Sequence, residues 1–437
     1  MTRPGGVWRN WARSVHVRPR RVEFPASTGA VQRAVRAARS RGMRVKAVGA
    51  GHSFSAIAAA PDVLLDLTDL AGLVSIDRER SRVTLRAGTR LREIPRILAP
   101  YGLAMQNLGD IDRQSISGAI STGTHGTGAR FGGLSTQVAG ATLVTADGEL
   151  LTVDEERNPE LLPAVALGLG ALGILVEVTI RCVPAFVLRA VEAPEPLDGV
   201  LETLDGRVAD ADHFEFYWFP RTERVLTKTN TRLPEDARRA PRPRLRRWLG
   251  EEVLANGVYE VACTIGTAIP PVVSFISRVG AAGMANGTYT DTAHRVYTQH
   301  RTVRFREMEY ALPAAEVAPA FRELHDLVED RGWRISFPVE VRFAAADDLW
   351  LSTAYGRASG YIAVHRYWRE DPRAYFEAVE EIMRAHGGRP HWGKMHTADA
   401  AVLRERYPRF DDFTALRDRL DPDRVLANAY LERVLGE

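Results

Sequence analysis

Val48-Gly-Ala-Gly-His-Ser-Phe54 follows a short apolar run, Arg44 to Val48, that is typical of a strand. A dinucleotide-binding turn of the Rossmann type also follows a strand, but Phe54 stands here in place of its third glycine. The hydrolase elbow G-x-S-x-G fails in the same way, because Gly51-His-Ser-Phe-Ser55 closes on Ser55. The stretch is therefore a glycine turn with backbone amides suited to a pyrophosphate and a histidine after it, or else a plain tight turn.

Two more glycine clusters lie downstream. Ser115-Ile-Ser-Gly-Ala-Ile-Ser-Thr-Gly-Thr-His-Gly-Thr-Gly128 is too rich in glycine and hydroxyl residues to be one packed helix or strand. Its glycines let a ligand approach closely and its hydroxyls offer hydrogen bonds, which suits a diphosphate or a flat polar ring; an irregular loop is the alternative. Gly168-Leu-Gly-Ala-Leu-Gly173 has the G-x-G-x-x-G spacing but precedes a strand, so it lacks the context of a nucleotide-binding turn.

Around these clusters, helices and strands mix without an internal repeat, which predicts an α+β fold. In the first part the patterns predict helices over 28–41 and 91–101, and strands over 44–48, 62–67, 74–77, 82–87, 137–145, 149–153 and 173–181. Cys182-Val-Pro-Ala185 marks a domain boundary. Beyond it, strands over 213–219, 334–343 and 360–368 alternate with helices over 314–331 and 372–386, as in an antiparallel sheet with helices on one face. Residues 389–437 carry polar motifs and then helices.

The chain has 437 residues, and 58 Lys and Arg against 55 Asp and Glu leave a net charge of +3, with 45% hydrophobic residues. Such values are typical of a globular protein of two or three domains. Cys182 and Cys263 are too few for a disulfide framework, and no apolar leader follows Met1, so we expect a cytoplasmic protein. Residues 161–176 carry no charge, but proline and glycines interrupt them, and we reject a membrane span there.

The small net charge argues against nucleic-acid binding, and the densest basic stretch, Arg238 to Arg247, is broken by prolines and lacks aromatic residues. We interpret it as a solvated loop, with a phosphate-binding or membrane-surface patch as the alternative. The basic residues are nearly all arginines. The only lysines, Lys46, Lys228 and Lys394, therefore mark places where a compact ammonium is preferred to a guanidinium.

Two late segments gather residues that carry chemistry. Phe337-Pro-Val-Glu-Val-Arg-Phe343 alternates, so Glu340 and Arg342 point to the same face of a strand; a surface ion pair is the alternative. Pro390-His-Trp-Gly-Lys-Met-His396 brings two histidines, a tryptophan and Lys394 together. A zinc site is not expected there, because a cation lies between the histidines and no cysteine is near, and we predict no metal site in this chain.

Jointly and in this order, these motifs resemble those of the aldonolactone oxidoreductases in the vanillyl-alcohol oxidase family of FAD-linked enzymes. The resemblance extends from about Val17 onward and rests on the turn at 48–54, the Thr-Gly-Thr-His-Gly-Thr-Gly loop, the strand at 173–181, Glu-Val-Arg and His-Trp-Gly-Lys. It implies an L-gulono-1,4-lactone or D-arabinono-1,4-lactone oxidase or dehydrogenase. The implied fold is a two-part FAD-binding domain of the PCMH type over 17–185, a substrate cap domain over 186–386, and a segment over 387–437 that completes the flavin site.

By position, the resemblance implies FAD linked covalently through His52. The implied cofactor contacts are Val48, Gly49, Ala50, Gly51, His52, Ser53, Phe54, Gly109, Asp110, Ser115, Gly118, Thr122, Gly123, Thr124, His125, Ile174 and His391. The implied catalytic residues are Glu340, Arg342, Lys394 and Asp110, and these four together with His365 would contact the substrate.

The implied reaction transfers hydride from C2 of a sugar lactone to flavin N5, while the hydroxyl proton leaves to a base or water network that Glu340 or Asp110 assists. Arg342 would orient the sugar, and Lys394 would stabilise negative charge on the reduced flavin. The product is a 2-keto lactone that tautomerises to an ascorbate-type enediol. Gly109 leaves the flavin open where alanine would block it, which favours oxygen as the acceptor; a cytochrome or quinone is the alternative, and peripheral membrane association is left open.

An alditol oxidase or another sugar oxidase on the same scaffold is the first alternative. Alditol oxidases carry serine at the position of Asp110, which weakens that interpretation. The second alternative, a carbohydrate-binding module without activity, does not account for Glu340, Arg342 and Lys394 together.

Overall fold

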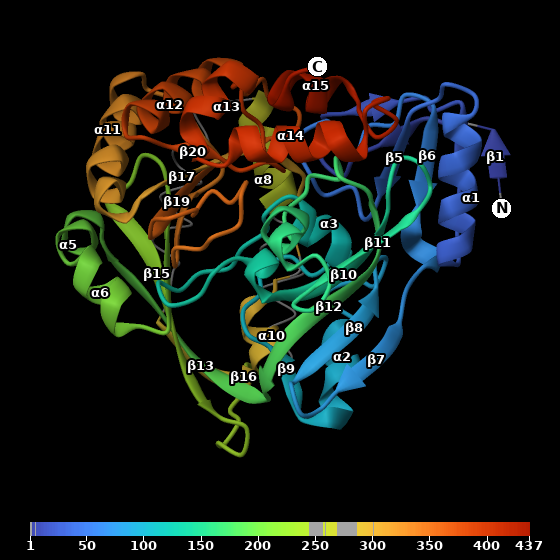
Figure 1. Ribbon diagram of the computed structural model, residues 1–437. Coiled ribbons are helices and arrows are strands. Elements are labelled where there is room, and N and C mark those ends of the chain that lie inside the picture. The colour runs from blue at the N-terminus through green and yellow to red at the C-terminus, as the bar shows by residue number, and fades with distance from the viewer. Residues whose placement is uncertain (1, 5, 244–256, 258, 269–285, 300) are drawn as a thin grey trace.

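The computed structural model describes residues 2–4, 6–243, 257, 259–268, 286–299 and 301–437. Its first sheet has four strands in the order β1-β4-β6-β5, with β4, β6 and β5 paired in parallel (Figure 1). These strands are Thr2–Pro4, Arg21–Glu23, Val63–Asp66 and Val45–Val48. Helix α1, Thr28–Arg39, lies between β4 and β5 in the chain, starts at the cap residue Ser27 and buries its apolar stripe. The glycine turn at 49–51 therefore begins where a buried strand of this sheet ends.

A second sheet of six strands follows, in the antiparallel order β11-β10-β12-β8-β7 with β9 paired to β12. Its strands are β7 Leu73–Asp77, β8 Arg82–Arg86, β9 Leu103–Met105, β10 Val138–Val144, β11 Leu150–Asp154 and β12 Ile174–Pro184. The short helices here are α2 Ile94–Leu98, α3 Ile116–Ser121 and α4 Leu162–Val165. The helix predicted over 91–101 is thus shorter than expected, because Pro100 falls in a 3-10 turn that ends it. Strand β12 runs past the predicted end at 181 and stops just before Ala185.

The third sheet has eight antiparallel strands in the order β16-β13-β15-β14-β18-β19-β17-β20. They are β13 Phe186–Pro196, β14 His213–Trp218, β15 Arg224–Pro234, β16 Gly287–Thr292, β17 Phe305–Pro313, β18 Val339–Ala344, β19 Ser359–Tyr367 and β20 Arg389–Pro390. The strand predicted over 334–343 begins only at Val339, since Pro338 has no N–H for the ladder.

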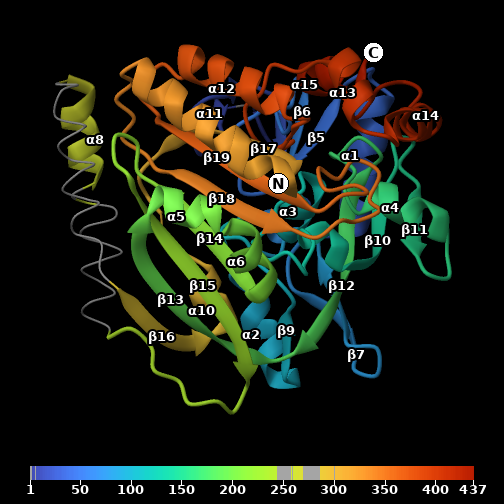
Figure 2. The same ribbon diagram turned by 90° about the vertical axis from the view of Figure 1, so that its left-hand side faces the viewer.

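Alternation along the central strands gives the third sheet two different faces. Helices α5 Leu197–Glu202, α6 Leu204–Asp210, α11 Val317–Asp330 and α12 Arg373–Ala385 lie along one face (Figure 2), where they share a core with Phe216, Met308 and Val341. The residues between these, including Glu215, Glu307, Glu309, Glu340 and Arg342, point to the opposite face and are nevertheless buried. Charged side chains therefore line the face of the sheet opposite to these four helices.

The last helices return to the first part of the chain. Helices α13 Ala400–Arg406, α14 Phe410–Leu420 and α15 Ala429–Leu435 lie beside the first sheet (Figure 1) and share its hydrophobic core. Asn428 donates hydrogen bonds to the carbonyls of Ala56, Ile57 and Ala59 at 2.9 to 3.1 Å. These three helices are thus a structural part of the glycine-turn region, whereas β20, earlier in the tail, belongs to the third sheet.

The remaining described elements are the hairpin of β2 Trp8–Arg9 and β3 His16–Val17, α8 Tyr259–Ala268 and α10 Ala293–Tyr297. Of the basic stretch 238–247, residues 238–243 lie on the surface, mostly exposed, and the rest fall outside the described residues. Among the described residues, no helix is both long and apolar enough to cross a membrane.

Candidate active site

The glycine turn after β5 packs directly against the second glycine motif. A Cβ atom on Gly49 would lie 2.1 Å from Ser115 Oγ, so this position accepts no side chain. Ser115 in turn caps α3 by accepting a hydrogen bond from the N–H of Gly118 at 3.2 Å. The backbone N–H groups of Ala50, Gly51, His52 and Ser53 donate to no acceptor in the part of the chain that the structure describes. Consecutive free amides of this kind form a concave site for an anion such as a diphosphate.

Both glycine motifs line one elongated cavity with two compartments. The first compartment lies between the turn, α3 and the start of β12 and encloses, together with its opening to solvent, about 900 Å³. The second lies against the charged face of the third sheet and encloses, with its opening, about 680 Å³. Both are lined by His52, Ser53, Gln114 and Thr122, so the two compartments meet at these side chains.

His52 occupies the junction in its neutral form. Its imidazole stacks on Trp11 with ring centroids 5.5 Å apart. Burial lowers the pKa of His52 to about 4, and the nearby cations Arg90, Arg113 and Lys394 act in the same direction. At neutral pH the ring therefore keeps an unprotonated nitrogen, which is the nucleophilic form.

The second compartment contains a buried cluster of alternating charges. Arg342 contacts Glu340 on its own strand, Glu215 through Nε at 3.1 Å, and Asp110 through Nη2 at 3.5 Å. Arg301 Nη2 lies 2.8 Å from the same carboxylate oxygen, Asp110 Oδ2. Because Glu340 and Arg342 are 5% and 7% exposed, the alternative of a surface ion pair is wrong. Arg342 Nη1 makes no hydrogen bond to another described residue and is available to a ligand.

The two carboxylates of this cluster that line the compartment, Asp110 and Glu340, differ in their affinity for a proton. Burial alone would raise the pKa of Asp110, but Arg301 and Arg342 hold it well below its ordinary value. Burial raises the pKa of Glu340, and the contact with Arg342 does not fully offset that effect. Glu340 is therefore the better proton acceptor of the pair, a distinction that sequence reasoning left open.

Lys394 lies on the other side of the compartment between two glutamates of β17. Its Nζ atom is 2.5 Å from Glu307 and 3.9 Å from Glu309. Burial would lower the pKa of Lys394, but the two carboxylates raise it, so the ammonium stays charged. His365 lies next to these groups, with its Nε2 atom 3.6 Å from Glu307 and its Nδ1 atom hydrogen-bonded to the carbonyl of Pro338 at 2.9 Å.

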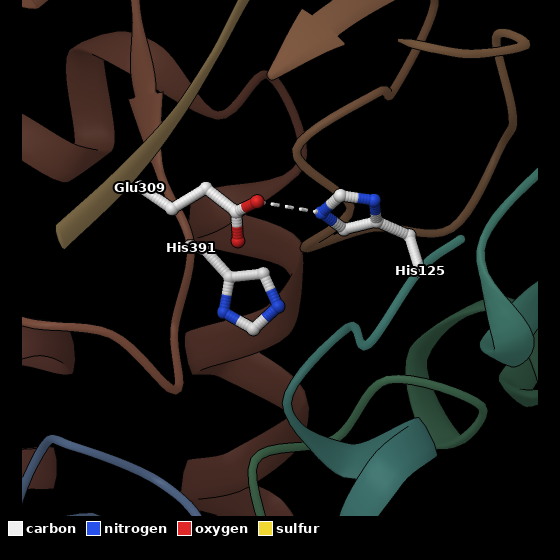
Figure 3. Close-up of side chains that lie close together, drawn as sticks. All are labelled: His125, Glu309 and His391. Atoms are coloured by element: carbon white, nitrogen blue, oxygen red, sulfur yellow. Dashed lines mark ion pairs between the residues drawn. The ribbon is translucent and has the colours of Figure 1, made fainter. Parts of the chain in front are cut away.

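Glu309 also lies between two histidines, as Figure 3 shows. His125 Nε2 is 3.2 Å from its carboxylate, and the donor atoms of His125, Glu309 and His391 lie within 4.8 Å of one another. Such spacing suits a metal ion, yet Lys394 already provides a positive charge 3.9 Å from Glu309. We interpret the group as a hydrogen-bonded cluster, and the absence of a metal site stays a prediction.

The structure brings nearly all implied site residues into the cavity. Val48, Gly49, Ala50, Gly51, Ser115, Gly118 and Ile174 line the first compartment, His52, Ser53 and Thr122 line both, and Phe54, Gly109, Asp110, Thr124, His125, Glu340, Arg342, His365, His391 and Lys394 line the second. Gly123 lines neither; it has φ +78° and shapes the turn after α3. The roles of these residues stay predictions.

Several functional candidates were missed from the sequence. Arg301, Gln114, Glu307 and Glu309 line the second compartment, and Lys46, which the sequence marked only as one of three lysines, lines the first. Glu307 and Glu309 carry the same signal as Glu340 and Arg342, namely charges at alternate positions of a strand. Arg301 and Gln114 carry no such signal, because they lie in irregular segments.

The residues present fit an FAD molecule. Free amides at 50–53 offer donors for a diphosphate, in a compartment that glycines and the hydroxyl residues Ser115 and Thr122 line. The junction at His52 connects this compartment to a second one, whose polar lining suits a flat ring and a small hydroxylated substrate.

Comparisons with known proteins agree with this geometry. Residues 19–154 match the model of the FAD binding domain, and residues 178–434 match that of D-arabinono-1,4-lactone oxidase. The L-gulono-1,4-lactone dehydrogenase of Mycobacterium tuberculosis is 44% identical over 430 residues, covering 98% of this chain and 99% of that protein. Bovine L-gulonolactone oxidase is 34% identical over 437 residues, with 98% of each chain covered.

A comparison with solved structures shows which proteins have a similar fold. A cholesterol oxidase from Brevibacterium sterolicum matches with a TM-score of 0.79 at 19% identity, covering 100% of this chain and 97% of that one. The expected two-part FAD-binding fold with a cap is thus confirmed, and so is the resemblance drawn from the motifs. The chain belongs to the D-arabinono-1,4-lactone oxidase family and carries the FAD-binding domain of these flavin-dependent oxidoreductases.

Proposed function

We propose that this protein oxidises an aldono-1,4-lactone of the L-gulono or D-arabinono type at its C2 hydroxyl, giving an ascorbate-type product. The observation that carries the proposal is the buried Asp110–Arg342–Glu340 cluster, which faces the same cavity as His52 and the glycine turn. The names of the relatives support the lactone as substrate class. When bound, FAD supplies the acceptor for the two electrons and the hydrogen that leave C2.

Glu340 and Arg342 have different roles toward the substrate, one as a proton acceptor and the other as a hydrogen-bond donor. Glu340 accepts the hydroxyl proton, because its raised pKa makes it the stronger base beside Asp110. Arg342 donates from Nη1 to the oxygen that becomes the ketone, since its other contacts already hold the guanidinium in place. Asp110 and His365 orient the remaining hydroxyls from opposite sides of the compartment.

Lys394 provides the positive charge that favours the reduced, anionic form of the cofactor. The charge is retained in the buried site because Glu307 and Glu309 raise the pKa of Lys394. A lysine fits here better than an arginine, since a compact ammonium fits between two carboxylates on alternate positions of one strand.

His52 is proposed to carry the covalent link to the cofactor. Its neutral imidazole at the junction supports this role. In the wild type the yellow colour should remain with the protein after acid precipitation, whereas in His52→Ala it should pass into the supernatant. His16→Ala, at an exposed histidine, is the matched control. Colour in the wild-type supernatant would refute the covalent link but not the use of FAD.

The electron acceptor is oxygen or another acceptor such as a cytochrome or a quinone. Gly109 supports oxygen access, because it places no side chain between the cavity and the carbonyl of His125, which lies 3.0 Å from the position of a Cβ. A cytoplasmic location is part of the same proposal, supported by two free, buried cysteines. A quinone acceptor would require contact with a membrane surface, whereas oxygen would not.

The test is a substrate panel with purified, flavin-loaded protein. L-gulono-1,4-lactone or D-arabinono-1,4-lactone should bleach the flavin absorbance without oxygen, and the colour should return when oxygen, ferricytochrome c or a quinone is added. Glu340→Gln should slow bleaching by about 10² to 10³. Bleaching by xylitol or sorbitol with none by the lactones would contradict the proposal in favour of an alditol oxidase.

A further inference from the structure

Lys228 is a buried lysine that the proposed reaction does not use. It lies on β15, is 3% exposed, and is not among the described residues that line either compartment. Its Nζ atom contacts Glu215 Oε1 at 3.2 Å and donates to the carbonyl of Val296 at 3.1 Å. In a chain where nearly every cation is arginine, a fully buried lysine at this position needs an explanation.

Lys228 belongs to a row of charges that crosses the third sheet. Glu192 on β13 and Glu215 on β14 are the register partners of Lys228 on either side. Arg342 follows on β18, where its Nε atom lies 3.1 Å from Glu215 Oε2. One oxygen of Glu215 therefore bonds Lys228 and the other bonds Arg342, and the row reaches the substrate compartment at its last member.

The row leaves the cluster around Arg342 without net charge. The carboxylates of Asp110, Glu215 and Glu340 face the cations Arg301, Arg342 and Lys228, three of each sign. Glu192, at the outer end of the row, has its own ion pair with Arg242 and adds no net charge. Asp110 and Glu340 face the cavity, whereas Glu215 approaches the guanidinium from behind. Without Lys228 the buried cluster would carry one excess negative charge, which a low-dielectric interior does not tolerate without shifting proton affinities.

We propose that Glu215 and Lys228 are positioning residues of the reaction, which fix the guanidinium of Arg342 and balance the charge around Glu340 without touching the substrate. The inference rests on the proposed function, in which Glu340 accepts the proton. The charged and titratable groups that face Glu340 are Arg342 on its own strand, Asp110 and Arg301 from two loops, and Glu215 and Tyr217 from β14. On the other side, β19 places Ala363 opposite it.

The proposal predicts opposite pH effects for the two partners. Lys228→Met removes a positive charge, raises the proton affinity of Glu340, and should move the acid limb of kcat/KM upward by about 0.5 to 1 pH unit. Glu215→Gln removes a negative charge, should move the limb downward by a similar amount, and should lower kcat/KM by about 10- to 100-fold as Arg342 loses its anchor. The double variant Lys228→Met with Glu215→Gln removes one charge of each sign and should return the limb close to that of the wild type.

Arg207→Met is the matched control, because it removes a half-buried ion pair with Glu195 of 2.7 Å in the same domain but outside this row. The proposal is overturned if Lys228→Met and Glu215→Gln lower the unfolding temperature but have the same pH profile of kcat/KM as Arg207→Met. In that case the pair is merely structural. The double variant also covers the case in which a single variant does not fold, since it buries no unpaired charge.

A crystal structure of Glu215→Gln separates this inference from the proposed function. The guanidinium of Arg342 should turn from its wild-type place toward Glu340 and Asp110, and an unmoved guanidinium would overturn the positioning role whatever the substrate is. Conversely, a wild-type enzyme that oxidises no lactone would contradict the proposed function, while a displaced Arg342 in this variant would still support the positioning role.

Discussion

The two compartments of the cavity recognise their ligands by different means. The first uses backbone: free amides at 50–53, Gly49 pressed against Ser115, and a short capped helix. The second uses side chains: buried charges on alternate positions of β17 and β18. The first therefore depends on local chain geometry, whereas the second depends on how distant strands are placed in one sheet.

This difference predicts that the two compartments fail separately. A change in the charged compartment should stop the reaction while the cofactor stays bound. A change in the glycine compartment should weaken cofactor binding while the chemistry of any loaded molecule stays intact. The predictions below run from the largest expected effect to the smallest.

Arg342→Met should have the largest effect. It leaves Glu340, Asp110 and Glu215 without their shared cation, and kcat/KM should fall by about 10³-fold or more. Flavin content per protein, measured by absorbance, should stay at the wild-type level. Arg207→Met serves again as the control, and loss of the flavin in Arg342→Met alone would show that the compartments are not independent.

Gly49→Ala tests the other compartment. Its new Cβ would meet Ser115 Oγ, which must move and open the turn, so FAD affinity should fall by about tenfold or more. The affinity is measured by titrating FAD into apoprotein in a His52→Ala background, which removes any covalent link. Gly199→Ala, with no atom within 4 Å of its Cβ, should bind FAD normally. A normal affinity in Gly49→Ala would contradict the close-packed cradle.

The pH dependence of kcat/KM in the wild type also distinguishes the two compartments. Because burial raises the pKa of Glu340, kcat/KM should be lost as pH falls through a value above the ordinary pKa of a glutamate, about 4.3. Asp110 should not contribute to this limb, since Arg301 and Arg342 hold its pKa far below it. FAD retention should stay constant over the same range, and a parallel loss of flavin would assign the limb to the first compartment instead.

His386 lies outside both compartments, and its substitution should have the smallest effect of these predictions. It bonds Glu316 at 2.6 Å and Glu323 at 3.0 Å, which link α12 to α11 and the turn before it on the helical side of the third sheet. Burial would lower the pKa of His386, but the two carboxylates raise it above its unfolded value, about 6.5. The stabilisation is thus fully present below that pH and is lost as pH rises through the folded pKa.

His386→Gln should therefore lower the free energy of unfolding by about 0.5 kcal/mol at pH 5.5, since both pairs are partly exposed, and by less at pH 9. Urea unfolding at the two pH values measures the difference. Activity and flavin content should not change, and a change in either would show that this surface cluster reaches the cavity.

The same contrast explains what the sequence could predict. The glycine turn, the strand that leads into it and the Glu340–Arg342 pair are local patterns, and each was placed from the residues alone. The contacts that complete the site are not local: Arg301 reaches Asp110 and Glu215 reaches Arg342 across long stretches of chain. No spacing rule states such a pairing, and only the register of the third sheet decides it.

The predicted ends of helices and strands were wrong where a proline interrupts the backbone hydrogen bonds. Pro100 shortened the helix predicted over 91–101, and Pro338 delayed the start of β18. The resemblance to the family added what local sequence patterns do not contain, namely which residues far apart in the chain lie in the same site. Neither the local patterns nor the resemblance predicted roles for Glu307, Glu309 and Lys228.

The return of the tail to the first sheet has a consequence for biosynthesis. Gly393 accepts a hydrogen bond from the N–H of Phe54 at 2.7 Å, and Leu426 accepts one from Lys46 at 3.0 Å, so the glycine turn reaches its final form only after residue 426 has been made. At about 5 to 20 residues per second, translation from Phe54 to Leu426 takes roughly 20 to 75 s. During that time the nascent chain holds an unfinished cradle, and cofactor loading follows the synthesis of these later residues.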